Sequence, residues 1–131
     1  MLSPKYIIAL SLFLTIVAAC AKQDDMPDGR RISANQAKRM ADRNAGAVLL
    51  DVRTEAEFSD KRIAGATLLP IDSIRTKASR VLPDKDALIL VYCRRGIRSM
   101  AAAEQLVSMG YTNVYDFGGI ESNRVFRVER D

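Results

Sequence analysis

Residues 87–99, "ALILVYCRRGIRS", decide the fold that we expect for this chain. The first part, "ALILVY", is apolar without alternation, and such a run is typical of a strand buried on both faces of a sheet. The second part sets Cys93 directly after that strand, among three arginines. It leads into "SMAAAEQLVSM", an alanine-rich helix that we expect Ser99 to cap and Gly110 to stop.

Two other apolar segments complete the alternation. "AVLLDV" at residues 47–52 is a second candidate for a strand buried on both faces, and "NVYDF" at residues 113–117 is a final strand that runs into a pair of glycines. Buried strands that alternate with helices predict an α/β domain with a mostly parallel central sheet flanked by helices.

The remaining segments are polar or short. Ser33 and Gln36 have the spacing of a capping box, so a helix is expected there, ending at "NAG". The other expectations are a short helix in "RTEAEFSDKR", a turn at Gly65 with a short strand ending at Pro70, and a helix in "IDSIRTKASRVL".

The composition limits the classes of function. The chain has 131 residues, 48% hydrophobic and 27% charged, which suits one globular domain. The net charge is +4 and most basic residues are scattered, so we expect no nucleic acid partner. Histidine is absent, which excludes histidine metal ligands, a Ser-His-Asp triad and a Cys-His pair. The two cysteines are too far apart in the sequence to form a zinc site. We expect no metal and no cofactor.

The N-terminus has the pattern of an export signal. One lysine precedes "IIALSLFLTIVAAC", and the apolar stretch is shorter than the ~20 residues of a spanning helix. "VAAC" resembles the lipobox of bacterial lipoproteins, which predicts a lipid on Cys20. The expected organisation is a signal peptide at 1–19, a lipidated N-terminus and polar tether at 20–30, and the folded domain at 31–131.

This organisation predicts an exported protein of the cell envelope, attached to the membrane by the lipid and facing the periplasm. The alternative is cleavage after Ala21, which would leave a soluble periplasmic protein.

The loop after Cys93 has the features of an anion site. Ligands bind beyond the carboxyl ends of strands in open α/β sheets, and a helix N-terminus offers N–H groups without internal partners. Gly96 permits a positive φ that turns amides inward. A helix N-terminus and arginines lower the pKa of a thiol from about 8.5, so Cys93 is a candidate nucleophile. The arginines of the loop are suited to a sulfur or phosphorus oxyanion.

Two other readings of Cys93 stay open at this point. It is a small core residue at a strand end, or it forms a disulfide with Cys20. The arginines alone are also compatible with a solvated surface run.

The loop "CRRGIRS" resembles the Cys-x-x-Gly-x-Arg-Ser signature of single-domain rhodaneses, which are sulfurtransferases. "LLDVRTEAEF", "IAGA", "AAAEQLVSMGYTNV" and the glycine pair also match, in order, over roughly residues 32–123. The resemblance implies a rhodanese-like fold. It also implies transfer of a sulfane sulfur from an anionic donor such as thiosulfate to a thiophilic acceptor such as cyanide, through a persulfide on Cys93.

The resemblance also assigns roles to residues. Cys93 is the expected catalytic residue, while Asp51 and Arg53 are expected to hold neighbouring loops, with Glu57 and Phe58 similarly structural. The expected substrate-binding residues are Arg94, Arg95, Gly96, Ile97, Arg98 and Ser99.

The chain departs from the family pattern at two positions, with Arg62 where a histidine is common and Asn123 near a common tryptophan. Phe126 is a candidate to cover the surface of that tryptophan. One alternative function is a sulfur-carrier or protein-binding module with little turnover. Another is a cysteine-dependent phosphatase or arsenate reductase, although those loops have five residues between cysteine and arginine and this one has four.

Overall fold

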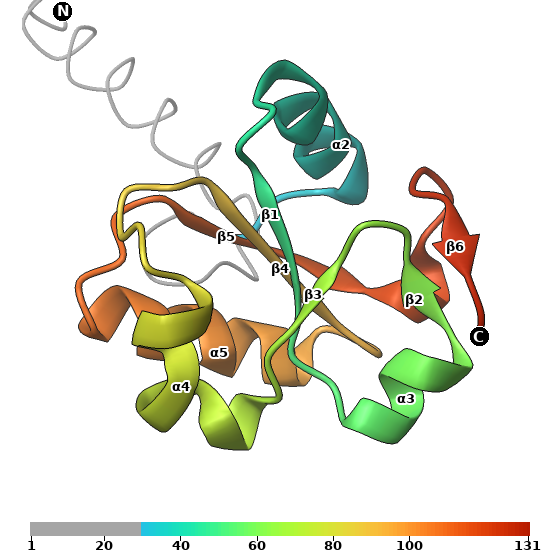
Figure 1. Ribbon diagram of the computed structural model, residues 1–131. Helices are drawn as coiled ribbons and strands as arrows, with labels where there is room; N and C mark the ends of the chain where they lie inside the picture. Colours follow the sequence, from blue (N-terminus) through green and yellow to red (C-terminus); the bar gives the residue numbers. More distant parts are fainter. Residues whose placement is uncertain (1–29) are drawn as a thin grey trace, which may run out of the picture.

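A computed structural model describes residues 30–131 (Figure 1). The expected signal peptide, the lipid on Cys20 and the tether up to residue 29 lie outside the described residues. Within 30–131, no helix has the length and apolar character needed to cross a membrane.

The centre of the fold is a parallel sheet of four strands in the order β3-β1-β4-β5. These strands are β1 (Val48–Asp51), β3 (Thr67–Leu68), β4 (Ile89–Cys93) and β5 (Val114–Gly119). Every residue of β4 is buried, as its unbroken apolar run predicts. The expected α/β architecture with a mostly parallel sheet is confirmed.

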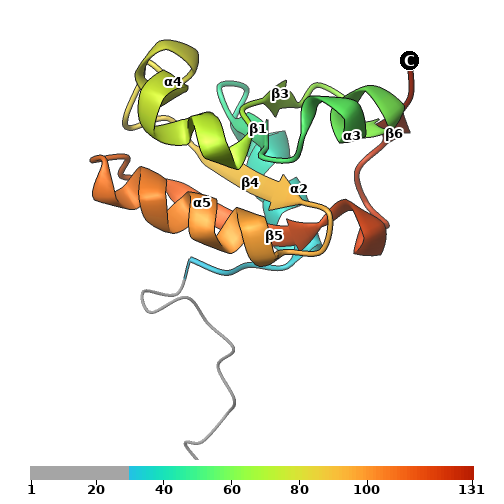
Figure 2. The same ribbon diagram turned by 90° about the horizontal axis from the view of Figure 1, so that it is seen from below.

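Helices cover the two faces of the sheet unequally (Figures 1 and 2). Helices α4 (Ile74–Val81) and α5 (Ile97–Ser108) pack on one face, where Ala102 and Ala103 allow α5 to lie close to the strands. Helix α2 (Ala34–Arg43) covers the other face. The capping box predicted for α2 from Ser33 and Gln36 is present.

Short elements fill the connections. Helix α3 (Glu55–Asp60) follows β1 and begins with a second capping box, from Thr54 to Glu57. The 3₁₀ turn η1 (Ile71–Ser73) precedes α4, and η2 (Ile120–Ser122) follows β5. Strand β2 (Arg62–Ile63) pairs antiparallel with β6 (Val128–Glu129), which the sequence did not predict.

Two expectations around Cys93 were wrong. Cys93 is the last residue of β4 and not the first residue beyond it. Helix α5 begins at Ile97 with Gly96 as N-cap, so Ser99 lies inside the first turn and does not cap it. The cause is the left-handed backbone of Gly96, φ 106°, which turns the chain into the helix three residues before Ser99.

The two departures from the family pattern have partners in the structure. Arg62 forms ion pairs with Glu129 and with Asp131. Asn123 donates to the carbonyl of Phe126, whose ring is 5.2 Å from that of Phe117 and belongs to the second buried cluster. The C-terminal segment therefore closes the face covered by α2.

Candidate active site

Cys93 lines a hollow of about 240 Å³ together with Arg94, Arg95, Ile97 and Arg98. Cys93 is only 1% exposed, and it is the one cysteine among residues 30–131, where it forms no disulfide. Its Sγ atom accepts a hydrogen bond from the Gly96 N–H at 3.0 Å. Cys93 is thus a strand-end residue packed in the core that also lines the hollow.

Ser99 supports the same sulfur from inside α5. Its Oγ is 3.4 Å from the Cys93 sulfur and 3.4 Å from the carbonyl oxygen of Gly118. A neutral thiol donates to Ser99, which then donates to Gly118. A thiolate has no proton, so the Ser99 hydroxyl turns its proton toward the sulfur.

Burial and hydrogen bonding act on the pKa of the Cys93 thiol in opposite directions. Burial is the largest influence and raises the pKa of Cys93, but it is outweighed by hydrogen bonds from the Ser99 hydroxyl and from the N–H groups of Ser99, Gly96 and Arg95. The net direction is a lowered pKa. The hydrogen bonds therefore stabilise the thiolate form of Cys93 more than burial destabilises it.

The end of β5 packs against the main chain of the loop that follows Cys93. A Cβ on Gly119 would lie 2.2 Å from the carbonyl oxygen of Arg94, so only glycine permits this approach. A Cβ on Gly96 would lie 2.6 Å from Nη2 of Arg31. Arg31 also donates to the Gly96 carbonyl at 3.3 Å and pairs with the buried Asp116 at 2.9 Å.

Sequence reasoning missed Arg31 and Asp116. The available signal was Asp116 itself, a carboxylate in the predicted buried strand "NVYDF", because a buried charge requires a partner. No local spacing could have identified Arg31 as that partner.

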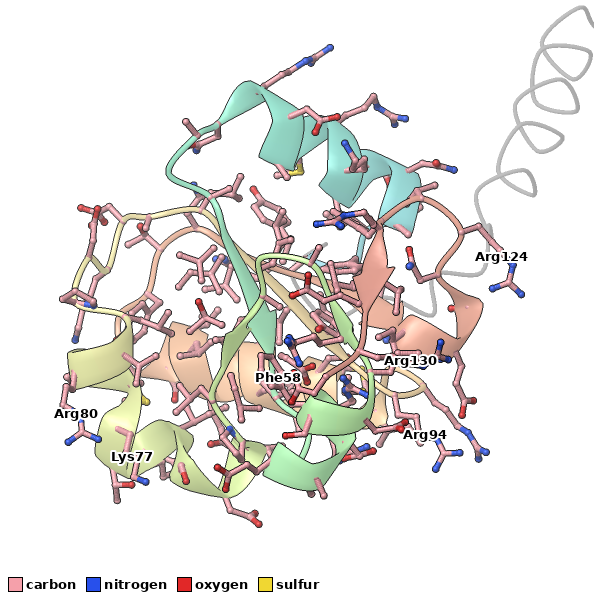
Figure 3. All side chains as sticks on the ribbon, turned by 45° about the vertical axis from the view of Figure 1, so that its right-hand side comes forward. Phe58, Lys77, Arg80, Arg94, Arg124 and Arg130 are labelled. Carbon is pink, nitrogen blue, oxygen red and sulfur yellow. The ribbon has the colours of Figure 1, made fainter. Side chains whose placement is uncertain are left out.

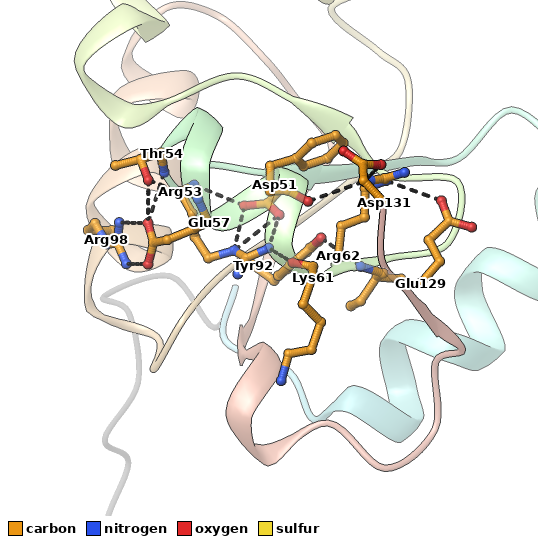
Figure 4. A network of polar contacts seen from close by, with 12 residues as sticks. Asp51, Arg53, Thr54, Glu57, Lys61, Arg62, Tyr92, Arg98, Glu129 and Asp131 are labelled. Atoms are coloured by element: carbon orange, nitrogen blue, oxygen red, sulfur yellow. Dashed lines mark hydrogen bonds and ion pairs between the residues drawn. The ribbon is translucent and has the colours of Figure 1, made fainter.

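Arg98 does not project freely into the hollow. Its two terminal nitrogens bind the two carboxylate oxygens of Glu57 at 2.8 and 2.9 Å (Figure 4). This pairing, with burial opposing it and hydrogen bonds from Thr54 adding to it, lowers the pKa of Glu57 to about 2. The positive charge of Arg98 is therefore fixed in place beside the loop.

The other two arginines share one carboxylate. Nε of Arg94 lies 2.5 Å from one oxygen of Glu121, and Nε of Arg95 lies 3.1 Å from the other. Figure 3 shows Arg94 at the opposite side of the molecule from Lys77 and Arg80 of α4. Ile97, by contrast, is 75% exposed at the same loop.

Asp51 and Arg53 form a buried pair next to the loop (Figure 4). The Arg53 side chain binds both oxygens of Asp51 and donates to the carbonyl of Lys61. The pair thus joins the end of β1 to the segment after α3.

The guanidinium carbon of Arg62 lies over the ring of Phe58, 4.9 Å from the ring centre. Over residues 30–131 no cluster of three histidine, cysteine or carboxylate side chains could hold a metal ion.

Comparison with known proteins gives one consistent family. The family described as "Rhodanese-like domain" matches residues 33–122. The thiosulfate sulfurtransferase PspE of Escherichia coli is 33% identical over 80 residues, covering 61% of this chain and 77% of that protein. The thiosulfate sulfurtransferase GlpE of Pseudomonas entomophila is 38% identical over 94 residues, covering 72% of this chain and 83% of that protein.

Solved structures agree. A rhodanese-related protein of Thermoplasma volcanium superimposes with a TM-score of 0.66 at 31% identity, over 78% of this chain and 99% of that one. A rhodanese with anions from Escherichia coli gives 0.61 at 28% identity, over 65% and 99%. The chain belongs to the rhodanese-like domain family.

Proposed function

We propose that this protein is a sulfurtransferase that moves a sulfane sulfur from an anionic donor such as thiosulfate to a thiophilic acceptor such as cyanide. The observation that carries the proposal is Cys93, whose thiol has a lowered pKa and hydrogen-bond donors aimed at its sulfur, and which lines a hollow together with arginines. The names of the relatives PspE and GlpE support the same chemistry.

The reaction has two steps. The Cys93 thiolate attacks the outer sulfur of thiosulfate, a sulfur–sulfur bond forms, and sulfite leaves with the electron pair of the bond that breaks. The carbon of cyanide then attacks the outer sulfur of the persulfide, so thiocyanate leaves and the thiolate returns. No proton, metal or redox partner is consumed in either step.

The loop residues have separate tasks in this proposal. The N–H of Gly96 and the Ser99 hydroxyl stabilise negative charge on the sulfur, because they point to it before any substrate binds. Arg98 places a guanidinium beside the loop, and Glu57 fixes its orientation. Arg94 and Arg95 are the exposed cations that capture the donor, and Ile97 lines the mouth of the hollow.

Incubation with thiosulfate and cyanide tests the function directly. The expected result is thiocyanate from the unaltered protein and none from Cys93→Ala. Absence of thiocyanate, together with no gain of one sulfur atom on Cys93 after thiosulfate alone, would reject the sulfurtransferase.

A carrier module is the second candidate. Ile97 is an exposed apolar side chain beside the reactive sulfur, which suits contact with a partner protein. This reading predicts a persulfide on Cys93 but little thiocyanate. The two measurements above therefore separate the carrier from the enzyme.

We also propose that the protein is exported and anchored by a lipid on Cys20, as the "VAAC" pattern indicates. Replacing Cys20 with serine should abolish lipid attachment and release the protein from the membrane fraction. Unchanged processing and fractionation of that variant would favour cleavage after Ala21.

A further inference from the structure

The three arginines of the loop are all paired with carboxylates of the protein itself. Arg98 is held by Glu57, while Arg94 and Arg95 are held by Glu121, one on each oxygen. An anion that arrives at Cys93 therefore finds each guanidinium of the loop already paired with an internal carboxylate. It competes with that carboxylate for the charge of the arginine.

The two carboxylates, Glu57 and Glu121, differ in how strongly they bind their arginine partners. Glu57 binds Arg98 through two parallel hydrogen bonds, its side chain is 26% exposed, and Thr54 binds it as well. Such a bidentate, partly buried pair keeps its geometry. Glu57 is therefore a fixed partner of Arg98.

Glu121 holds its partners at the surface. Its side chain is 42% exposed, and those of Arg94 and Arg95 are 55% and 70% exposed. Exposed ion pairs contribute little net stability, because water competes and long side chains lose entropy when they are held. An incoming divalent anion can displace Glu121 far more easily than Glu57.

The main chain keeps Glu121 in this place. Its N–H donates to the carbonyl of Arg94 at 3.2 Å, and Gly119 brings η2 directly against the loop. Glu121 lines a second hollow, of about 260 Å³, and Arg94 borders both this hollow and the one at Cys93. Arg94 therefore lies where it can pair with Glu121 on one side or with an anion on the other.

We propose that Glu121 is a specificity-determining residue, an internal counter-ion that holds Arg94 and Arg95 and yields them to a divalent sulfur oxyanion at Cys93. This inference deepens the proposed function and rests on it. A dianion such as thiosulfate can bind both guanidinium groups, and these new ion pairs compensate for the two that Glu121 loses. A neutral or singly charged donor gains less, so Glu121 discriminates against it and restores the resting pairs when sulfite leaves.

The test uses the full-length chain and two alkylating reagents of different charge. Iodoacetate and iodoacetamide both transfer a carbon to the thiolate with loss of iodide, but only iodoacetate is an anion. The two rates are measured by mass spectrometry on the Cys93 peptide at low ionic strength. Their ratio reports how strongly the site attracts anions, because a change in the pKa or reactivity of the thiol affects both rates equally.

Glu121→Gln should raise the iodoacetate-to-iodoacetamide ratio about threefold to fivefold, as expected for release of exposed ion pairs. Glu129→Gln is the matched control, since Glu129 is similarly exposed, at 35%, but pairs with Arg62 away from the loop. The control should leave the ratio unchanged. The KM for thiosulfate should fall in Glu121→Gln with kcat retained.

A second background tests whether the arginines transmit the effect. In Arg94→Gln/Arg95→Gln, the further change Glu121→Gln should alter the ratio much less. An unchanged ratio in Glu121→Gln, or an equal change in both backgrounds, would overturn the inference. Alkylation needs no sulfur transfer, so the two proposals can fail separately. If Glu121→Gln raises the ratio but the unaltered protein makes no thiocyanate, the proposed function is rejected and the role of Glu121 as counter-ion stands.

Discussion

The loop after β4 has a buried inner side, which faces the Cys93 sulfur, and an exposed outer side, which faces solvent. The inner side, where Gly96 and Ser99 face the Cys93 sulfur, is buried, and Gly119 packs directly against its main chain. The outer side carries Arg94 and Arg95, which are exposed and share one surface carboxylate. The inner side therefore sets the chemistry of the sulfur, and the outer side adjusts which anions reach it.

The largest effect should come from changing the contact that supports the inner side. In Gly119→Ala the new Cβ would lie 2.2 Å from the carbonyl oxygen of Arg94, so the main chain of the loop must move. We expect a loss of about 3 kcal/mol in stability and a fall of about a hundredfold in kcat/KM, since overpacking displaces the loop.

Gly46→Ala is the control for that substitution, because its nearest contact is an ordinary 3.5 Å. It should change stability by less than about 0.5 kcal/mol. Equal effects of the two variants in denaturant unfolding and in thiocyanate production would contradict the special status of Gly119.

The next effect concerns the hydroxyl that faces the sulfur. Ser99→Ala removes a donor to the thiolate, so the pKa of Cys93 should rise and the midpoint of its alkylation should move up by about one pH unit. Ser108→Ala, at the far end of the same helix, should leave the midpoint unchanged. A midpoint unaffected by Ser99→Ala would mean that main-chain groups alone hold the thiolate.

A third prediction separates the fixed pair from the exchangeable one. The pKa of Glu57 is lowered to about 2 from 4.5, chiefly by Arg98, so the folded state favours the carboxylate. The stabilisation is complete above about pH 4.5 and is lost as the pH falls toward 2, with at most about 3 kcal/mol involved.

Glu57→Gln should flatten the decline in unfolding free energy over this range. Glu55→Gln, on the same helix, is the control and should keep the decline. Identical pH profiles for Glu57→Gln and the unaltered protein would show that the Arg98 pair is not formed in solution.

The smallest effect is expected on the outer side. Arg95→Gln should raise the KM for thiosulfate by no more than about fivefold, with no change in thermal stability, because the residue is exposed. Arg80→Gln should have no effect, because Figure 3 shows Arg80 on the opposite side of the molecule from Arg94, the neighbour of Arg95 in the chain. A large fall in kcat for Arg95→Gln would place this residue on the inner side instead.

The same division explains what the sequence could predict. The buried strand β4, the positive φ of Gly96 and the stop of α5 near Gly110 follow from local patterns, and all three are confirmed. The role of Ser99 was misjudged because serine is a favoured N-cap, whereas the left-handed Gly96 had already started the helix.

Contacts between distant segments could not be predicted. Glu121 reaches Arg94 and Arg95 only because β5 returns beside β4 and η2 then lies against the loop. Arg31 reaches Asp116 because the chain before α2 runs beside β5. Charge and spacing in one segment contain no information about such partners.

The most direct test of sulfur transfer through Cys93 is the mass of the Cys93 peptide after exposure to thiosulfate and again after cyanide. We expect the peptide to gain one sulfur atom, and to lose it with release of an equal amount of thiocyanate when cyanide is added. An unmodified Cys93 after thiosulfate, in a folded protein whose thiol still reacts with iodoacetamide, would contradict sulfur transfer through this residue.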